Sequence, residues 1–473
     1  MKVFFRACIS LVFRRLFFAC GEVPEDEPTT PPNTAVVARP SRASGQRFLF
    51  ASNPYMDAVY RINLDNMDVD EVRVGNKPRD IAVSPDGNTV AVVNEENGSI
   101  SVIDTVSLAN RGVRVGYRPR DVVFSPDGTL LATANYDESS VSVIDLADLT
   151  QWKVSVGGGP TSLSFDTESR YLAVANYSTD DFEVIDLETK QTLLGWLRAV
   201  LHLWADDPYT TTTVFCWPLF WPFCWYAVDT HVDGLWDLLD RPQVISFGVA
   251  GTPSERMLVL GTRVDPFDEI DSTTEFSVLA MTWPEGMTFG EFAQAVEDYV
   301  EDEIDDDDTA DDDTVDIGDD LAVYGQFVAT AINPGAFVWN RTGTALYTIN
   351  FGKDDAISVS TVCRLSLNED GVMKEEGRAA VGLHPVALAI SDDDTLVATA
   401  NKDENTVTIV RADGWSTKTV TTEARPFALA FNGSGTKLIV VHETPLMPVS
   451  VVDVASGSSK VVIDSLSMSR WMD

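Results

Sequence analysis

Short apolar runs of four to six residues recur along this chain, and each is bounded by Gly, Pro, Asn or Asp. The runs are rich in β-branched side chains, which is typical of β-strands rather than helices. Proline begins one run, and Asn or His ends the following run sixteen residues later. This happens six times, in the pairs Pro78/Asn94, Pro119/Asn135, Pro160/Asn176, Pro334/Asn350, Pro385/Asn401 and Pro426/His442.

The spacing between successive prolines is 41 residues from Pro78 to Pro119 to Pro160, and again from Pro385 to Pro426. Each repeat holds a Gly-x-x-Pro corner, an apolar strand, a turn such as Ser84-Pro85-Asp86-Gly87, a second strand, and a strand of alternating polar and apolar residues. A fourth strand leads to the next corner. Four short strands in about 41 residues predict one blade of a β-propeller.

The number of blades follows from counting strand sets. Eight sets begin near Phe48, Val90, Leu131, Tyr171, Met257, Leu346, Leu396 and Leu438. We therefore predict an all-β propeller of four-stranded antiparallel blades with eight blades. Seven result if the first set, which has no strand before it, completes the last blade and closes the ring. Nine result if a tryptophan-rich stretch at 190–240 forms a blade of its own.

Together the Ala-Asn strand ends, the Val-x-Val-Ile-Asp strands, the Gly-x-x-Pro corners and the Ser-Pro-Asp-Gly turns resemble the bacterial and archaeal YVTN family of β-propeller repeats. The resemblance covers roughly residues 47–189 and 332–463. It implies the propeller fold and often a location outside the cytoplasm. It implies no catalytic residue.

Two stretches of the predicted propeller, 46–473, depart from the repeat. Residues 190–240 hold six of the eleven tryptophans. Three interpretations are a divergent blade, a shifted and restored reading frame, and a membrane-dipping loop, which Pro218 and Pro222 disfavour. The second stretch, 265–330, contains a capping-box start at Thr288–Glu291 that predicts a helix over 288–304. Runs of Asp follow it, and we interpret them as a solvated loop rather than a calcium site.

The N-terminus resembles a bacterial lipoprotein signal peptide. Residues 1–20 combine basic and apolar residues and end in Ala19-Cys20, which makes Cys20 the candidate lipidation site. Residues 21–45 are acidic and rich in Pro and Thr, which predicts a flexible tether. We therefore expect an exported, membrane-anchored protein at the periplasmic or cell surface, with the lipid as its only contact with the membrane.

Charge and cysteine content narrow the possible partners. The formal net charge is −39, which argues against nucleic acid as a partner because its phosphates would be repelled. The cysteines beyond the signal are three, so a disulfide framework is not expected. We expect a monomer.

Candidate site residues are few. The chain has four histidines, and no haem, zinc, copper, phosphate-loop or serine-hydrolase motif is present, so we predict no cofactor, no metal and no catalytic set. His384, at a blade corner, and His442, at a strand end, are candidates for lining one face of the ring. The strand-end asparagines Asn94, Asn135, Asn176, Asn350 and Asn401 would gather on the same face. Their recurrence in nearly every repeat favours a structural role, in which Asn caps a turn or takes a left-handed backbone.

The function that these features favour is a non-catalytic binding or scaffold propeller at the cell envelope. Its partner would be a protein, glycan or small ligand at one propeller face. The alternative is a hydrolase resembling the lactonase propellers, with its site at the central channel. Convergence of His384, His442, an arginine and a carboxylate at the channel mouth would favour the hydrolase.

Overall fold

Strands and turns make up almost all of the residues that the structure describes. The computed structural model describes residues 35–38, 46–66, 68–179, 181–193, 242–248, 252, 254–262, 278–283, 288–289, 291–292, 324–328, 334–351, 359–368, 373–443 and 449–463. Its strands form eight antiparallel sheets of four strands, each a meander of consecutive strands. An all-β propeller of four-stranded antiparallel blades is therefore confirmed.

The first four sheets carry the most regular repeats. Their strands are β1 (Ala35–Ala38), β2 (Phe48–Asn53), β3 (Ala58–Asn63), β4 (Val69–Arg73); β5 (Pro78–Val83), β6 (Thr89–Asn94), β7 (Ser99–Asp104), β8 (Asn110–Arg114); β9 (Pro119–Phe124), β10 (Leu130–Asn135), β11 (Ser140–Asp145), β12 (Gln151–Ser155); and β13 (Pro160–Phe165), β14 (Tyr171–Asn176), β15 (Asp181–Asp186), β16 (Gln191–Leu193).

The remaining four sheets follow the tryptophan-rich stretch. Their strands are β17 (Pro242–Phe247), β18 (Met257–Thr262), β19 (Val278–Thr282), β20 (Tyr324–Val328); β21 (Pro334–Trp339), β22 (Ala345–Asn350), β23 (Thr361–Leu367), β24 (Met373–Ala380); β25 (Pro385–Ile390), β26 (Leu396–Asn401), β27 (Thr406–Arg411), β28 (Thr417–Thr421); and β29 (Pro426–Phe431), β30 (Lys437–His442), β31 (Val449–Asp453), β32 (Ser459–Ile463).

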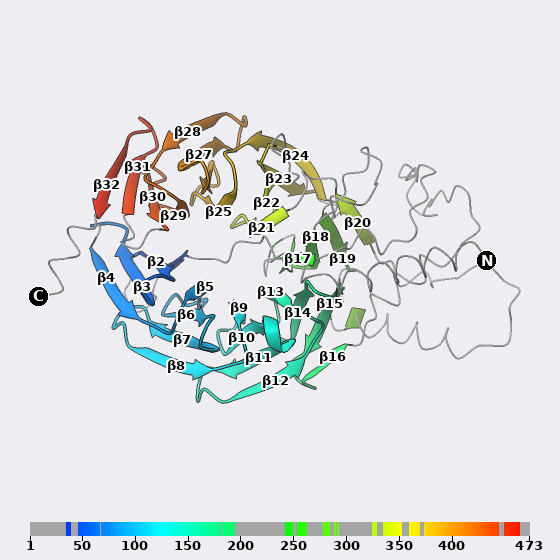
Figure 1. Cartoon of the computed structure of the whole chain (residues 1–473). Coiled ribbons are helices and arrows are strands. Elements are labelled where there is room, and N and C mark those ends of the chain that lie inside the picture. The colour runs from blue at the N-terminus through cyan, green and yellow to red at the C-terminus, as the bar shows by residue number, and fades with distance from the viewer. Residues whose placement is uncertain are drawn as a thin grey trace, which may run out of the picture.

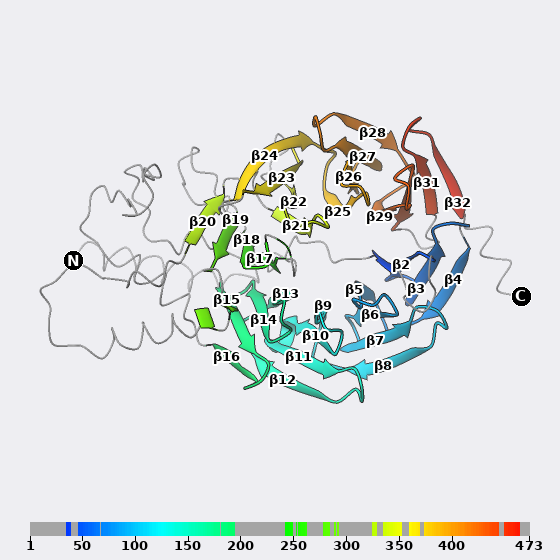
Figure 2. The ribbon, with the colours of Figure 1, turned by 180° about the vertical axis from the view of Figure 1, so that it is seen from behind.

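The sheets are arranged around a common centre, with the labelled first strands, β5 to β29, innermost and the fourth strands on the perimeter (Figures 1 and 2). Each innermost strand contacts the innermost strand of the next sheet, from β1 and β5 through to β25 and β29. The strand β1 also contacts β29, which brings the first sheet against the last. The inner strands β13 and β17 contact each other directly, although the tryptophan-rich stretch separates them in sequence.

The hydrophobic core lies between neighbouring sheets. One cluster joins β6 and β7 to β10 and β11, with Val93, Ile100, Leu131 and Ile144 fully buried. Another runs from the seventh and eighth sheets into the first, and it includes Leu49 of β2 together with residues of β26 and β30. Similar clusters lie between other neighbouring sheets, which explains why the second strands are largely apolar.

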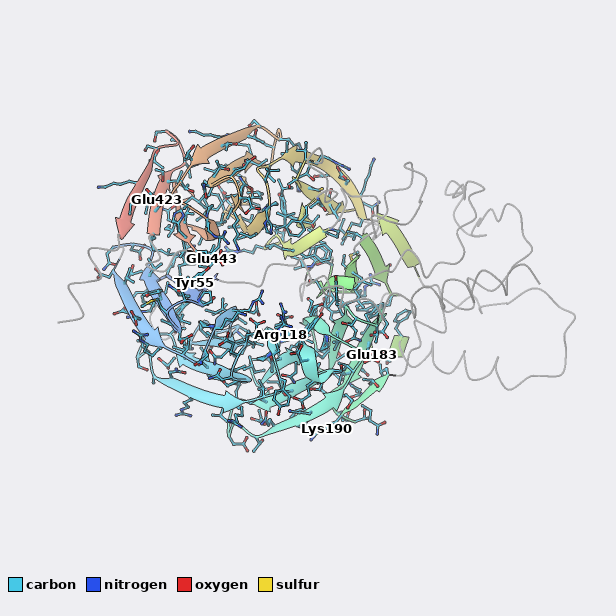
Figure 3. All side chains as sticks on the ribbon, viewed as in Figure 1. Tyr55, Arg118, Glu183, Lys190, Glu423 and Glu443 are labelled. Atoms are coloured by element: carbon cyan, nitrogen blue, oxygen red, sulfur yellow. The ribbon has the colours of Figure 1, made fainter. Side chains whose placement is uncertain are left out.

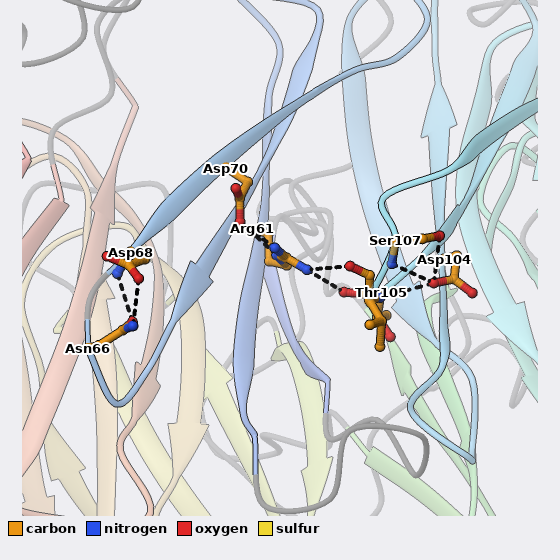
Figure 4. Close-up of polar contacts among 8 residues, drawn as sticks. Arg61, Asn66, Asp68, Asp70, Asp104, Thr105 and Ser107 are labelled. Carbon is orange, nitrogen blue, oxygen red and sulfur yellow. Dashed lines mark hydrogen bonds and ion pairs between the residues drawn. The ribbon is translucent and has the colours of Figure 1, made fainter.

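Polar contacts add to this packing at the perimeter. Arg61 on β3 pairs with Asp70 on β4 of its own sheet, at 3.0 Å from Nε. It also donates to the main-chain carbonyls of Thr105 and Val106, at 2.9 and 3.0 Å, in the turn after β7 (Figure 4). One arginine thereby ties the first sheet to the second.

Two predictions of element positions need correction or comment. Residues 35–38, which the sequence placed in the tether, form β1 and pair with β2. The sequence analysis missed this strand because the short Ala-Val-Val-Ala run lies within a Pro/Thr-rich stretch. The first strand set therefore has a strand before it, contrary to the prediction. The predicted capping box is present, because Thr288 Oγ1 accepts from the Glu291 amide at 3.2 Å and Glu291 accepts from the Thr288 amide at 2.8 Å. The rest of the predicted helix, the Asp runs, Cys20, and all of 190–240 beyond Leu193 lie outside the described residues.

Candidate functional site

The recurring proline and asparagine are partners in the sheet ladder. Pro78 lies opposite Asn94, Pro119 opposite Asn135, and Pro426 opposite His442, with a register shift beside each pair. The sixteen-residue interval is therefore the length of one hairpin between the first and second strands. It places the residues around each pair at the same end of every sheet, which we call the corner rim.

At the corner rim, the asparagine side chains bind within their own sheets. Asn135 Nδ2 donates to Ser140 and Ser142 at 3.1 and 2.9 Å, and its Oδ1 accepts from the Gly116 amide at 2.9 Å. The other asparagines likewise donate to side chains on the third strand, namely Asn94 to Ser99 and Ser101, Asn176 to Asp181, Asn350 to Thr361 and Cys363, and Asn401 to Thr406 and Thr408.

This contact explains the glycine of the Gly-x-x-Pro corner. A Cβ on Gly116 would lie 2.4 Å from Asn135 Cγ, and one on Gly75 would lie 2.7 Å from Asn94 Cγ. Glycine is required here for close approach and not for a positive φ. None of the five asparagines has a positive φ. The backbone at these positions is therefore not left-handed, and the asparagine side chain instead joins the second and third strands of its sheet, which is a structural role.

His442 takes the place of asparagine in the last sheet. Its side chain is fully buried, and Nε2 lies 2.9 Å from Ser450 Oγ. Burial lowers the pKa of the imidazole to about 4, because the charged form would lose its hydration. The imidazole of His442 is therefore neutral near pH 7, and its contact with Ser450 lies within the last sheet.

His384 lies at the corner before Pro385 and is exposed. Its Nδ1 lies 3.0 Å from Asp403 Oδ2, and its ring meets Phe351 edge-on at 6.0 Å between centroids. The two candidate histidines thus have separate partners, His442 with Ser450 and His384 with Asp403.

A cluster of basic side chains surrounds one buried carboxylate at the same rim. Glu95 follows Asn94, and its side chain is only 2% exposed. Its oxygens lie 3.0 Å from Lys77 Nζ, 3.1 Å from Arg79 Nη1, 3.1 Å from Arg118 Nε and 3.6 Å from Arg120 Nε. We call these five residues the Glu95 cluster. Burial alone would raise the pKa of Glu95, but the four cations, led by Arg79, lower it to about 2.

The repeat geometry creates this cluster from two neighbouring sheets. Lys77 and Arg79 flank Pro78, and Arg118 and Arg120 flank the equivalent Pro119. Tyr136, which holds the position after Asn135, packs beneath both arginines of its own corner, with guanidinium carbons 5.6 and 4.9 Å from the ring centroid. Stacking on an aromatic face restricts the orientation of a guanidinium group.

A smaller cluster occupies the corner rim between the seventh and eighth sheets. Glu443, which follows His442, lies 2.7 Å from Lys402 Nζ and 2.8 Å from Arg425 Nη2. Burial alone would raise the pKa of Glu443, but these two cations lower it by more, so the pKa lies below its usual value. Arg118 and Glu443 both lie toward the inside of the ring, as does Tyr55, whereas Lys190 lies at the perimeter (Figure 3).

Deeper in the ring, side chains two residues after the proline bridge neighbouring inner strands. Asp80 and Asp121 both accept from the amide of Val122, at 2.9 and 2.8 Å, and Asp121 also accepts from the Leu163 amide at 2.5 Å. Burial raises the pKa of Asp121 to about 6. These carboxyls satisfy amides of the inner strands that face the next sheet.

Sequence reasoning missed both charged clusters. The signal was present as Lys77-Pro78-Arg79 and Arg118-Pro119-Arg120, two basic-Pro-basic corners 41 residues apart. Glu95 could be added by extending the Pro78–Asn94 pairing by one residue. In the part of the chain that the structure describes, no three His, Cys, Asp or Glu side chains are placed to hold a metal ion. Within the same ranges, no helix is long and apolar enough to cross a membrane.

Comparisons with known proteins give similarities of fold at low identity. No protein-family model and no curated sequence matches the chain. Among solved structures, Kuenenia stuttgartiensis hydrazine synthase is 14% identical to this chain, with a TM-score of 0.47. The match covers 81% of this chain and 94% of the other chain. A candidate 6-phosphogluconolactonase from Bacteroides uniformis is 15% identical, with a TM-score of 0.45 and coverages of 78% and 93%. A functionally unknown protein from Desulfotomaculum acetoxidans is 11% identical, with a TM-score of 0.48 and coverages of 84% and 99%.

Proposed function

We propose that this chain is a non-catalytic binding propeller of the YVTN type, held at the cell envelope, whose ligand contacts the corner rim. The observation that carries the proposal is the gathering of Lys77, Arg79 and Arg118 at this rim, in a chain whose net charge is −39. A local group of positive charges on a molecule that is otherwise negative attracts anionic groups of a partner.

The positions of the histidines support binding rather than hydrolysis. His442 is buried against Ser450, and His384 pairs with Asp403 in solvent. A hydrolase with these residues as acid and base would need them within hydrogen-bond reach of one reacting group. Each instead serves its own corner.

We further propose that eight sheets close one ring. The contact between β1 and β29, and the apolar cluster that runs from the seventh and eighth sheets into the first, support this closure. A closed ring leaves only the short outer strands as sheet edges, so partners are limited to the two faces and the perimeter.

The cellular location completes the proposal. Lipid on Cys20 would anchor the chain, with the residues between Cys20 and β1 as spacer and the propeller in water. Cys20→Ala should move the protein from the membrane fraction to the soluble fraction, with the circular dichroism spectrum unchanged. Recovery of the wild-type chain from the cytoplasm with Met1 attached would refute the location.

The binding role is tested with the purified Cys20→Ala chain. We expect it to retain a partner from envelope extract, and charge reversal by Lys402→Glu with Arg425→Glu to reduce that retention. The control is Lys153→Glu, which reverses a charge on the perimeter strand β12. Lactone hydrolysis at a rate typical of enzymes, lost on His384→Ala, would support the hydrolase instead.

A further inference from the structure

We propose that Asn97 is an N-glycosylation site, to which an oligosaccharyltransferase transfers a glycan from a lipid-pyrophosphate donor. The proposal rests on the cell-envelope location in the proposed function, because asparagine glycosylation marks surface loops of exported proteins. It places a covalent modification at the corner rim.

The acceptor sequence for this modification is Asn-x-Ser or Asn-x-Thr, in which the middle residue is not Pro. It occurs four times in this chain, at Asn97, Asn176, Asn340 and Asn432, followed two residues later by Ser99, Ser178, Thr342 and Ser434. The sequence alone does not distinguish the four. Their surroundings do, because a bulky polar glycan requires an amide nitrogen that stays accessible in the folded chain.

Burial excludes two of the four asparagines. Asn176 is fully buried, and its Nδ2 donates to Asp181 Oδ1 at 2.8 Å. Asn340 is 6% exposed, and its Nδ2 donates to the hydroxyls of Thr342 and Thr344 at 2.9 and 3.1 Å. A glycan on either nitrogen would have to lie inside a close-packed part of the protein. This holds whether the transfer precedes or follows folding.

Asn432 is half-buried, in the turn between β29 and β30. Its Nδ2 donates to Ser434 Oγ at 3.0 Å and to Thr436 Oγ1 at 3.2 Å. A sugar replaces one of the two hydrogens on this nitrogen, so modification would remove one of these hydrogen bonds. Glycosylation of Asn432 therefore competes with the contacts of its own turn.

Asn97 differs from the other three. It is exposed, in the turn between β6 and β7 at the corner rim, and its Nδ2 donates to none of the residues that the structure describes. Its Oδ1 holds the side chain instead, and accepts from the Asn76 amide at 3.2 Å and from Ser99 Oγ at 3.3 Å. A sugar on Nδ2 therefore displaces no hydrogen bond to these residues and leaves both contacts of Oδ1 in place.

The turn also brings the two ends of the acceptor sequence together. The 3.3 Å contact places the Ser99 hydroxyl beside the Asn97 amide. Gly98, between them, has a φ of 58°, and a Cβ on it would lie 2.7 Å from the Gly116 carbonyl oxygen. The Gly98 carbonyl accepts from the Val115 amide at 2.9 Å. The middle residue thus packs against the chain that follows β8, while the Asn97 side chain stays exposed.

The transfer is a substitution without oxidation or reduction. A bond forms between Asn97 Nδ2 and the anomeric carbon of the first sugar, and the bond from that carbon to the pyrophosphate of the lipid donor breaks. The lipid pyrophosphate leaves, and one proton of Nδ2 is released. The product keeps one N–H on Nδ2 and the Oδ1 acceptor.

Mass spectrometry of peptides tests the site, on the chain purified from the membrane fraction of the cells that naturally produce it. Cleavage after Lys and Arg yields peptide 80–111, in which Asn97 is the one acceptor asparagine. We expect this peptide to carry the mass of one glycan, with fragment ions that place it on Asn97. Peptide 171–190, which contains Asn176, should be unmodified.

Variants produced in the same cells separate the acceptor sequence from the fold. Asn97→Gln and Ser99→Ala should each abolish the added mass, whereas Ser99→Thr keeps an acceptor sequence and should retain it. All three should keep the circular dichroism spectrum of the wild type. The matched control is Ser434→Ala, which destroys the acceptor sequence of Asn432 and should leave the added mass unchanged.

Peptide 80–111 found unmodified, or with Asn97 merely deamidated to Asp, would overturn the proposal, as would a glycan on Asn432 in place of Asn97. If the unmodified chain comes from the membrane fraction, the glycosylation site is wrong and the proposed location stands. If the unmodified chain comes from the cytoplasm, the proposed location is wrong as well.

Discussion

His442 should make the last sheet of the propeller sensitive to acid. Its side chain is fully buried, and burial lowers its pKa from 6.5 to about 4. Between these two values the unfolded chain binds a proton that the folded chain does not, so stability falls as pH falls. The contribution is complete above pH 6.5 and is lost as the pH approaches 4. At 1.36 kcal/mol per pKa unit, it amounts to about 3 kcal/mol as an upper value.

The substitution that tests this argument gives the last sheet the glycine and asparagine that the second sheet has at the same positions. Glu423 and His442 stand where the second sheet has Gly75 and Asn94. A Cβ on Gly75 would lie 2.7 Å from Asn94 Cγ, so glycine and asparagine must be introduced together. In the double variant Glu423→Gly/His442→Asn, the new amide can donate to Ser450 as Asn94 donates to Ser101 at 3.2 Å.

Thermal and urea unfolding between pH 7.5 and pH 4.5 provide the assay. Many carboxyls titrate in this range, so the informative quantity is the difference between wild type and variant. We expect the double variant to gain up to about 3 kcal/mol relative to wild type as the pH falls. The single variant His442→Asn should be less stable than the double variant at every pH, because the Cβ of Glu423 obstructs the amide. A difference between wild type and double variant that is constant from pH 7.5 to 4.5 would refute the burial argument.

Three further predictions concern the corners and the inner strands, and melting temperature measures each. Asp121→Asn should destabilise the protein, because its Nδ2 would face one of the two amides from which the carboxylate oxygens now accept. The loss should be smaller above pH 6 than at pH 4, by up to about 3 kcal/mol, because the raised pKa of Asp121 makes wild-type stability fall as pH rises from 3.8 to about 6; a loss that is equal at both pH values would contradict this. Gly116→Ala should destabilise by about 1–3 kcal/mol through contact with Asn135, whereas Gly112→Ala, whose Cβ meets nothing within 4 Å, should change stability by less than about 0.5 kcal/mol. Cys363→Ser should leave stability almost unchanged, since Ser101 and Ser142 occupy the same position in other sheets. Cys363→Val should cost about 1–3 kcal/mol, because the Asn350 side-chain amide would lose its partner at 2.8 Å. Equal effects of the two variants would argue against this contact.

The propeller could be predicted because its determinants are local and repeated. Pro78 and Asn94 mark one hairpin, and the turn glycines Gly87 and Gly128 take the positive φ values, 69° and 71°, that their sequence motif indicates. The starts of the eight predicted strand sets fall within one residue of β2, β6, β10, β14, β18, β22, β26 and β30. Periodicity reports such features directly, because each repeat confirms the others.

The details that could not be predicted depend on contacts between strands. Asn135 was expected to cap a turn or to take a left-handed backbone. Its side chain instead donates to Ser140 and Ser142 on the next strand and so joins the two strands. Serine or threonine recurs five and seven residues after several of the asparagines, and this spacing could have predicted the contact between the two strands. The strand β1 was missed because four apolar residues do not stand out within an acidic, Pro/Thr-rich stretch.

In a ring of similar sheets, chemistry that is specific to a ligand must come from positions that differ between repeats. The residue before the corner proline and the residue after the strand-end asparagine are such positions. The first is Lys77, Arg118, Gly159, His384 or Arg425, and the second is Glu95, Tyr136, Tyr177, Phe351, Lys402 or, after His442, Glu443. The ladder places both at the corner rim, so their differences cost the sheets little. At the corner rim, Glu95 and Glu443 each pair with more than one cation, and they lie in separate parts of the described structure. These variable positions at the corner rim are therefore where we expect the residues that select a ligand.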